Sequence, residues 1–201
     1  MERVVSGTRD HLTIPVTIPI TIPVDDGIEL RGVSVADGPE LYAAIDRNRV
    51  RLRKWLPWAG LAFEQTDLFA FLQQREIDNA ARVSLTTHIR LHGELCGAIG
   101  LHVIDQRHRN TSIGYWLDGE YEGRGIMTRA CRAIVTEGFR QYGLHRIEIR
   151  CATGNSRSLA IPRRLGFVEE GILREAEWVF DQWFDLRVFS MLEQDWKLQS
   201  S

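Results

Sequence analysis

The sequence predicts an α/β protein with a mixed central sheet flanked by helices. Two segments, at residues 113–139 and 146–165, pass from a β-prone run through a glycine-containing turn into apolar residues at helical spacing. Between residues 84 and 117, short β-prone runs follow one another with turns between them, which is typical of a meander. Strands followed by a helix that returns to the sheet predict one crossover connection.

The N-terminal segment carries an internal repeat, Thr-Ile-Pro followed by Val or Ile, three times between Thr13 and Val24. In an extended chain Ile and Val fall on one face, and Thr and Pro on the other, as a half-buried strand requires. The prolines lack amide hydrogens along one edge, so only the opposite edge can pair. We expect an extended arm or edge strand over residues 1–26. An edge strand, an arm on a partner subunit of a homo-oligomer and a disordered tail all fit the pattern.

The rest of the chain, residues 27–201, is long enough for one domain with a sizeable core. We expect strands at residues 28–33, 84–91, 95–104, 111–117, 146–151, 167–180 and 183–192. We expect helices at residues 37–47, 51–58, 65–82 and 156–165, and a further helix that begins at Ile126. In that helix the apolar residues form two rows, with Ile126, Ala130 and Ile134 in one and Met127, Cys131, Val135 and Phe139 in the other. The rows predict its buried face.

The loop at residues 118–128 is suited to holding phosphate. Gly123 and Gly125 lie close to the start of the helix at Ile126. There the first amides lack partners within the helix and the dipole favours an anion, while glycine lets a ligand approach the backbone. The loop therefore predicts a pyrophosphate site, with a simple tight connection as the alternative.

Several motifs occur together with this loop, and they lie at residues 51–58, 93–100, 114–117, 123–125, 155–158 and 165–167. In order and spacing they resemble the GNAT superfamily of acyl-CoA-dependent N-acetyltransferases, in particular its Rim-type branch, which acetylates the N-termini of ribosomal proteins. The resemblance runs from about Gly27 to Trp196. It implies the GNAT fold and acetyl-CoA as the acetyl donor.

The resemblance assigns the donor site to one group of residues. They are Trp116, Leu117, Gly123, Arg124, Gly125, Ile126, Met127, Thr128 and Asn155. Gly125 matches the central glycine of the family's phosphate loop, while Glu122 and Met127 depart from its first and last positions. A carboxylate beside a pyrophosphate is unfavourable, so we expect the Glu122 side chain to point away.

Acetyl transfer needs a neutral amine and a proton for the departing thiolate. In the Rim-type branch the serine that matches Ser158 is held to be the proton donor, and the asparagine that matches Asn155 binds the pantetheine arm. Many GNAT enzymes place a proton-donating tyrosine where this chain has Pro162. Helix capping by Asn155 and Ser158 is the alternative.

For the base we expect Glu177, which matches a catalytic glutamate of the Rim-type branch. Glu175 would share its strand face and the acceptor site, and mutual repulsion would raise one pKa. A solvated strand face is the alternative for both glutamates. Trp55 and Trp58 either wall the acceptor site or belong to the core.

The resemblance implies N-acetylation of the α-amine of a ribosomal protein. Acetylation of a small amine, such as a polyamine, an antibiotic or an aminoacyl nucleotide, is the alternative within the same chemistry. A catalytically silent acyl-CoA-binding module is a further alternative, and it would bind CoA without turnover.

Composition limits the other function classes. Lys plus Arg number 25 and Asp plus Glu number 27, a near balance that gives no electrostatic case for nucleic-acid binding. No segment resembles a signal peptide or a membrane span, so we expect a cytoplasmic protein without membrane contact. Cys96, Cys131 and Cys151 lie in apolar patterns without paired spacing, and we expect buried free thiols. The histidines show no ligand spacing, so we expect no metal.

Overall fold

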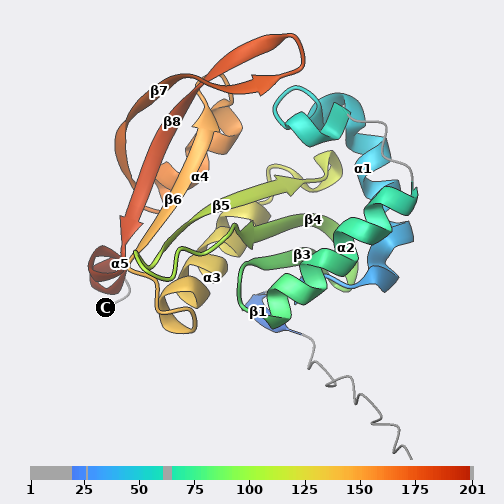
Figure 1. The fold of residues 1–201 in the computed structure, drawn as a ribbon, viewed down its shortest axis with the longest axis horizontal. Coiled ribbons are helices and arrows are strands. Elements are labelled where there is room, and N and C mark those ends of the chain that lie inside the picture. The colour runs from blue at the N-terminus through green and yellow to red at the C-terminus, as the bar shows by residue number, and fades with distance from the viewer. Residues whose placement is uncertain (1–19, 26, 61–64, 200–201) are drawn as a thin grey trace, which may run out of the picture.

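The computed structural model describes residues 20–25, 27–60 and 65–199. Its centre is an eight-stranded sheet with the order β1-β2-β3-β4-β5-β6-β8-β7 (Figure 1). The strands are β1 Thr21–Asp25, β2 Ile28–Gly32, β3 Leu85–Leu91, β4 Glu94–Leu101, β5 Asn110–Leu117, β6 Arg146–Ala152, β7 Val168–Val179 and β8 Gln182–Leu192. The α-helices are α1 Gly38–Leu52, α2 Gln65–Ala80, α3 Ile126–Arg140, α4 Ser156–Arg164 and α5 Glu193–Gln199. Short 3-10 helices form at η1 Val35–Asp37, η2 Pro57–Gly60 and η3 Gly119–Tyr121.

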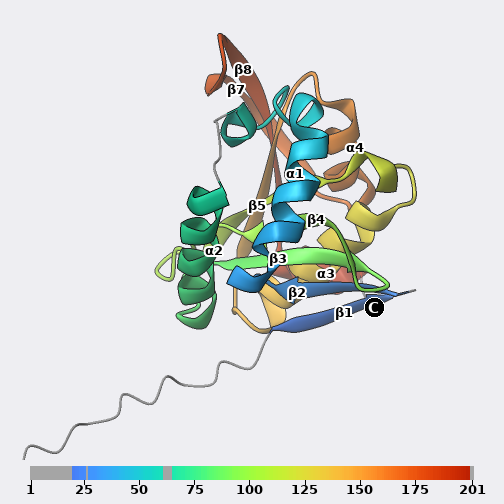
Figure 2. The same cartoon turned by 90° about the vertical axis from the view of Figure 1, so that its right-hand side faces the viewer.

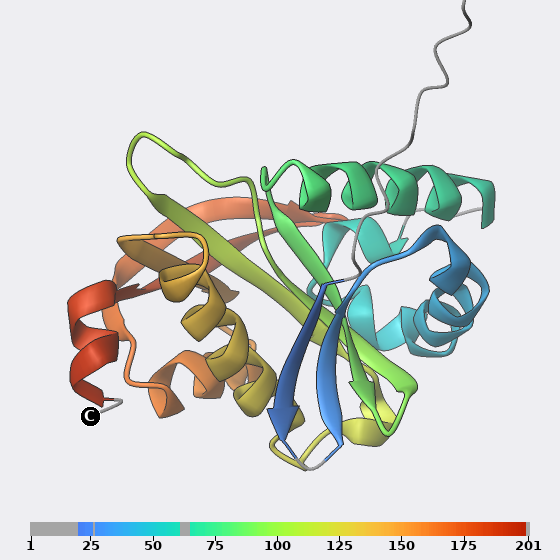
Figure 3. The ribbon, with the colours of Figure 1, turned by 90° about the horizontal axis from the view of Figure 1, so that it is seen from below.

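Helices cover both faces of the sheet (Figure 3). α3 packs with the larger core cluster, and its buried residues include both apolar rows that the sequence predicts. α1 and α2 lie over the other face, where a second cluster joins Leu41 and Ile45 to Leu68, Leu72 and Leu95. No helix in the described part of the chain is long and apolar enough to cross a membrane.

The sheet opens at its centre, between β5 and β6. These are the parallel pair, and they are joined through α3, which is the crossover that the sequence predicts. Their pairing ends at Ile113 and Ile149. Beyond these residues β5 continues along β4 alone and β6 along β8 alone. The two strands therefore diverge, as Figure 1 shows, and leave a gap in the middle of the sheet.

The strands at the two edges of the sheet differ in length, with the short β1 at one edge and the long β7–β8 hairpin at the other (Figure 2). At one end, the last repeat of the N-terminal segment forms β1, in which Ile22 and Val24 are half-buried against the core while Thr21, Pro23 and Asp25 are exposed. The first two repeats, up to residue 19, lie outside the described residues. At the other end, the long β7–β8 hairpin reaches to the C-terminal end of α1, where Phe180 contacts Arg53 and Phe184 contacts Trp55 (Figure 1).

One expectation about the elements was wrong, and one helix was missed. Residues 51–58 do not form one helix, because α1 runs on to Leu52 and a separate turn begins at Pro57, whose ring disfavours helix in the residue before it. The sequence also gave no expectation of α5. This helix is anchored by one buried side chain, Trp196, whose ring lies 6.4 Å from that of Phe139.

Candidate active site

A cleft of about 1620 Å³ enters the gap between β5 and β6. Its walls come from these two strands and from parts of β3, β4, β7 and β8, together with α1, α2, α4, η2 and the first turn of α3. Most of the predicted site residues line it, namely Trp55, Trp58, Trp116, Leu117, Gly123, Gly125, Ile126, Met127, Thr128, Asn155, Ser158 and Glu177. Arg124 and Glu175 do not line it. The fold thus brings together residues that are more than a hundred positions apart in the chain.

The glycine loop forms an open cradle at the start of α3. Gly123 and Gly125 have φ angles of +77° and +71°, a left-handed conformation that glycine adopts at little cost. A Cβ at either position would meet nothing within 4 Å. Gly125 is the N-cap residue of α3 and offers no side-chain cap to its first amides, so these amides are suited to an anionic ligand. Arg124 lies outside the cradle, with its guanidinium 5.5 Å from the centre of the Tyr121 ring.

Glu122 lines the cleft, and the expectation that its side chain points away from the pyrophosphate stays a prediction. Its carboxylate accepts a hydrogen bond of 2.5 Å from Arg51 Nη1 and a second bond from Arg157 Nη1. Two guanidinium groups compensate its charge. Arg51 also donates to the carbonyl oxygen of Leu117 and to Asn48. Sequence reasoning missed Arg51 and Arg157 as site residues, although both lie inside the recognised motifs.

Ser158 lies in the first turn of α4 with its hydroxyl in a polar cluster. Asn155 Oδ1 accepts the Ser158 amide hydrogen at 3.1 Å, so Asn155 is the helix cap. The Ser158 hydroxyl is free of that role. It lies 3.0 Å from Tyr115 Oη on β5 and 3.1 Å from Cys151 Sγ on β6. Burial raises the pKa of Tyr115 well above its usual value, and burial also raises the pKa of Cys151.

Glu177 lines the cleft from β7 and is half-buried, and this burial raises its pKa. Glu175 lies elsewhere. It is exposed, has a left-handed φ of +46°, and donates its amide hydrogen to Asp185 Oδ1 at 2.8 Å. The pairing with β8 is irregular between Leu173 and Glu177, which interrupts the alternation of faces. The expectation that both glutamates share one face and that repulsion between them shifts a pKa was therefore wrong.

A comparison with known proteins identifies this arrangement. Residues 28–168 match the family model described as an Acetyltransferase (GNAT) domain. The chain belongs to this family. YdaF of Bacillus subtilis (strain 168), which carries the provisional name of a ribosomal N-acetyltransferase, is 36% identical over 179 residues, or 87% of this chain and 96% of YdaF. The fold and the N-acetyltransferase class that the sequence predicts are confirmed.

Solved structures agree with this GNAT assignment. RimL, a ribosomal L7/L12 alpha-N-protein acetyltransferase in complex with coenzyme A, superposes with a TM-score of 0.84 at 26% identity, covering 88% of this chain and 99% of RimL. MccE, a microcin C7 self-immunity acetyltransferase in complex with acetyl-CoA and AMP, superposes with a TM-score of 0.79 at 29% identity, covering 84% of this chain and 94% of MccE.

Two tryptophan side chains, Trp55 and Trp58, line the cleft between the end of α1 and η2. Trp55 lies 5.8 Å from Phe184 of β8, which joins the end of α1 to the β7–β8 hairpin. Trp58 lies edge-on to Trp116 at 6.5 Å and packs against the second core cluster. Both line the cleft. The two interpretations from the sequence, wall and core, thus coexist at Trp58.

Where β4 and β5 line the cleft, two paired glycines leave room for a neighbouring side chain. Gly100 of β4 pairs with Gly114 of β5, and both line the cleft. A Cβ at Gly114 would lie 2.5 Å from Nε2 of His102, whose Nδ1 lies 2.9 Å from Ser112 Oγ. Glycine at Gly114 therefore gives room for the imidazole of His102, another cleft residue that the sequence analysis did not single out.

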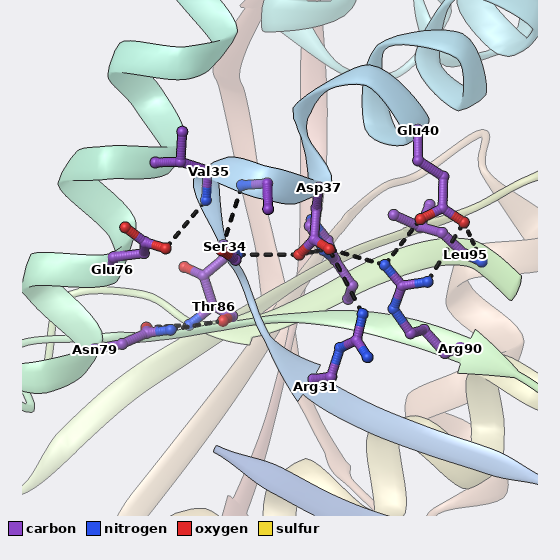
Figure 4. A network of polar contacts seen from close by, with 12 residues as sticks. Arg31, Ser34, Val35, Asp37, Glu40, Glu76, Asn79, Thr86, Arg90 and Leu95 are labelled. Atoms are coloured by element: carbon purple, nitrogen blue, oxygen red, sulfur yellow. Dashed lines mark hydrogen bonds and ion pairs between the residues drawn. The ribbon is translucent and has the colours of Figure 1, made fainter. Parts of the chain in front are cut away.

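A buried ion network holds α1 over β3 (Figure 4). Asp37 contacts Arg90 Nη2 through Oδ1 and His88 Nδ1 through Oδ2, each at 2.9 Å. Glu40 binds the same Arg90 nitrogen at 2.8 Å and accepts the Leu95 amide hydrogen at 2.9 Å. Burial raises the pKa of Asp37, but hydrogen bonding to His88 and the nearby positive charge outweigh it and bring the pKa to about 2. The network positions the helix that carries Arg51.

The cysteines are free and buried, as predicted. Among residues 20–25, 27–60 and 65–199, no three His, Cys, Asp or Glu side chains group so that they could hold a metal ion.

Proposed function

We propose that this GNAT enzyme transfers the acetyl group of acetyl-CoA to the α-amine of a protein N-terminus, with a ribosomal protein as the acceptor. One observation carries the proposal: a single cleft joins an open glycine cradle at the start of α3 to a serine hydroxyl and a half-buried glutamate. The names of YdaF and RimL support the ribosomal acceptor. A ribosomal acceptor places the reaction in the cytoplasm.

The donor would be held mainly by backbone groups. The amides from Gly123 to Thr128 would bind the pyrophosphate, because the cradle at Gly123 and Gly125 is open and free of side chains. Trp116 and Leu117 would offer the free edge of β5 to the pantetheine arm, with Asn155 beside it. Acetyl-CoA supplies the activated acetyl group as a thioester.

The protons would be handled by two side chains of this chain. Glu177 takes the proton that the acceptor amine releases, and its raised pKa makes it a stronger base than an exposed carboxylate. Ser158 gives a proton to the departing thiolate. Exchange with water restores both groups after each turnover.

The chemistry favours an α-amine over a lysine side chain. An α-amine has a pKa of about 8 and a lysine of about 10.4, so at neutral pH a far larger share of the α-amine is uncharged. A carboxylate base suffices for the first and is poorly matched to the second.

A peptide assay tests this proposal. The enzyme is incubated with acetyl-CoA and a synthetic peptide carrying the N-terminus of ribosomal protein L7/L12, and the products are sequenced by mass spectrometry. We expect one acetyl group on the α-amine. The matched control is the same peptide with a blocked α-amine, which we expect to stay unmodified. Acetylation of an internal lysine in the blocked peptide would contradict the α-amine assignment.

A small amine is the second candidate, because MccE, which is similar to this chain, was solved with acetyl-CoA and AMP. Spermidine and a non-hydrolysable aminoacyl adenylate form the other arms of the assay. A kcat/KM on either compound that exceeds the value on every peptide would favour this candidate. Binding of acetyl-CoA in calorimetry without turnover on any amine would indicate a silent module.

A further inference from the structure

The hydroxyl of Ser158 is not isolated in the cleft wall. Tyr115 Oη lies 3.0 Å from Ser158 Oγ and 3.2 Å from the carbonyl oxygen of the same residue. Cys151 Sγ lies 3.1 Å from Ser158 Oγ and 3.8 Å from Tyr115 Oη. Three groups that each carry one hydrogen thus meet at one point, and all three residues line the cleft.

Tyr115 lies where β5 and β6 separate, and its side chain contacts the opposite side of the gap. Tyr115 is the second residue of β5 beyond Ile113, where pairing with β6 ends. Its phenol crosses the gap and contacts β6 through Cys151 and α4 through Ser158. Among the described residues, the Tyr115 hydroxyl lies within hydrogen-bond distance of the Ser158 hydroxyl, the Ser158 carbonyl oxygen and the Cys151 thiol.

Counting hydrogens leaves two kinds of arrangement: Ser158 donates its hydrogen to Tyr115 or to the Cys151 sulfur, or it accepts hydrogens from these neighbours. If Ser158 donates to Tyr115, its own hydrogen is engaged and the tyrosine donates to the carbonyl oxygen. If Tyr115 donates to Ser158 Oγ, the serine hydrogen is free to turn into the cleft. A developing negative charge in the cleft favours the second arrangement, because it attracts the serine hydrogen.

We propose that Tyr115 is a positioning residue for Ser158: its hydroxyl donates to Ser158 Oγ and leaves the serine hydrogen directed into the cleft. The inference rests on the proposed role of Ser158 as the proton donor. Cys151 supports the same arrangement as a second, weaker donor to the serine oxygen. When Ser158 gives its hydrogen to the departing thiolate, the two donors stabilise the charge left on its oxygen.

Tyr115 is protonated at neutral pH. Burial holds the pKa of the phenol well above its usual value, and burial also raises the pKa of the Cys151 thiol. Both groups therefore carry their hydrogens at neutral pH and can donate them to Ser158 Oγ. In this arrangement Tyr115 acts through Ser158, which distinguishes it from a tyrosine that protonates the thiolate itself.

The experiment uses Tyr115→Phe, which removes one oxygen and keeps the ring. Steady-state kinetics are measured with acetyl-CoA and the L7/L12 N-terminal peptide, and acetyl-CoA affinity by calorimetry. We expect kcat to fall about tenfold, which corresponds to one hydrogen bond lost in the transition state, with the Kd for acetyl-CoA within about twofold. Tyr142→Phe is the matched control, since Tyr142 is half-buried after α3 and outside the cleft, and we expect its kcat to be unchanged.

A double-mutant cycle with Ser158→Ala separates positioning from packing. We expect Tyr115→Phe to have no further effect on kcat in the Ser158→Ala background. An equal loss in both backgrounds would show that Tyr115 acts independently and would overturn the inference. A Tyr115→Phe variant with unchanged kcat would also overturn it, while the role of Ser158 would stand. If Ser158→Ala itself kept full kcat, the proposed function of Ser158 would fail first.

Discussion

At the residue scale, Ser158 and Glu177 reach one cleft from α4 and β7. If Ser158 protonates the departing thiolate, Ser158→Ala should lower kcat on the order of a hundredfold. Acetyl-CoA affinity should stay nearly intact, because the lost interaction is made chiefly in the transition state. The loss should be similar at every pH. Steady-state kinetics with calorimetry check this, and a variant that loses affinity but keeps kcat would contradict it.

Glu177 should control the pH dependence of the reaction. Its pKa is raised by burial, so activity of the parent enzyme should increase with pH as this carboxyl ionises. Glu177→Gln should lose this increase of activity with pH. Its activity at acidic and neutral pH should fall on the order of a hundredfold. Part of the activity should return above about pH 8, where the acceptor amine deprotonates unaided. A profile parallel to that of the parent enzyme would remove Glu177 from the mechanism.

The sequence could indicate these residues but not their surroundings. Ser158 and Asn155 follow from a motif of local spacing, and the structure places both on the cleft. The contacts of Ser158 with Tyr115 and of Glu122 with Arg51 join segments far apart in the chain, and no local pattern encodes such pairs. Glu175 was misplaced because a strand irregularity changes which side chains face the cleft.

At the element scale, the glycine cradle and the buried ion network fix the two sides of the cleft. Gly125→Val should weaken acetyl-CoA binding by at least tenfold, because a branched side chain would fill the space above the α3 amides and disfavour the left-handed φ. Calorimetry on the folded variant measures this.

A second glycine provides the control for backbone strain in that experiment. Gly143 also has a left-handed φ, of +61°, with open space around it, but lies outside the cleft. Gly143→Val should lose stability as Gly125→Val does, yet keep acetyl-CoA affinity. If Gly125→Val and Gly143→Val bound acetyl-CoA with equal affinity, the placement of acetyl-CoA at the glycine cradle would be contradicted.

The network at Asp37 should make stability fall in acid. Its pKa is about 2 in the fold against an ordinary 3.8, so its contribution is fully present above about pH 4 and is lost as pH falls toward 2. Asp37→Asn should cost about 2 kcal/mol at pH 7, with the difference from the parent protein shrinking in acid. Denaturant unfolding from pH 7 to pH 3 measures it. Asp46→Asn, which removes an exposed partner of Arg49, should change little at any pH.

At the scale of the whole molecule, the sequence predicts the fold class, the crossover and nearly every element, because apolar periodicity survives in each of them. It could not give the strand order, which depends on pairing between distant segments. It also missed α5, whose polar sequence has one buried anchor in Trp196. The family comparison and the fold agree on the same architecture.

The edge strand β1 provides the last test. Ile20, Ile22 and Val24 pack against the main core, and Asp25 Oδ1 accepts a hydrogen bond of 2.9 Å from Arg129. Removing residues 1–24 should uncover this apolar surface and turn β2 into a new sheet edge, which favours self-association. We expect Tm to fall by about 5 °C or more and the protein to lose solubility or change oligomeric state.

A shorter truncation separates β1 from the residues before it. Deleting residues 1–19 leaves the strand and its contacts with the core in place, so the difference in Tm between the two truncations measures the contribution of β1 alone. Calorimetric scans and size-exclusion chromatography at several concentrations compare both with the full chain. If only the longer truncation loses stability, β1 seals the edge of the sheet. If both keep the Tm, size and solubility of the full chain, the apolar face of β1 contributes nothing to stability, and the repeat has another role.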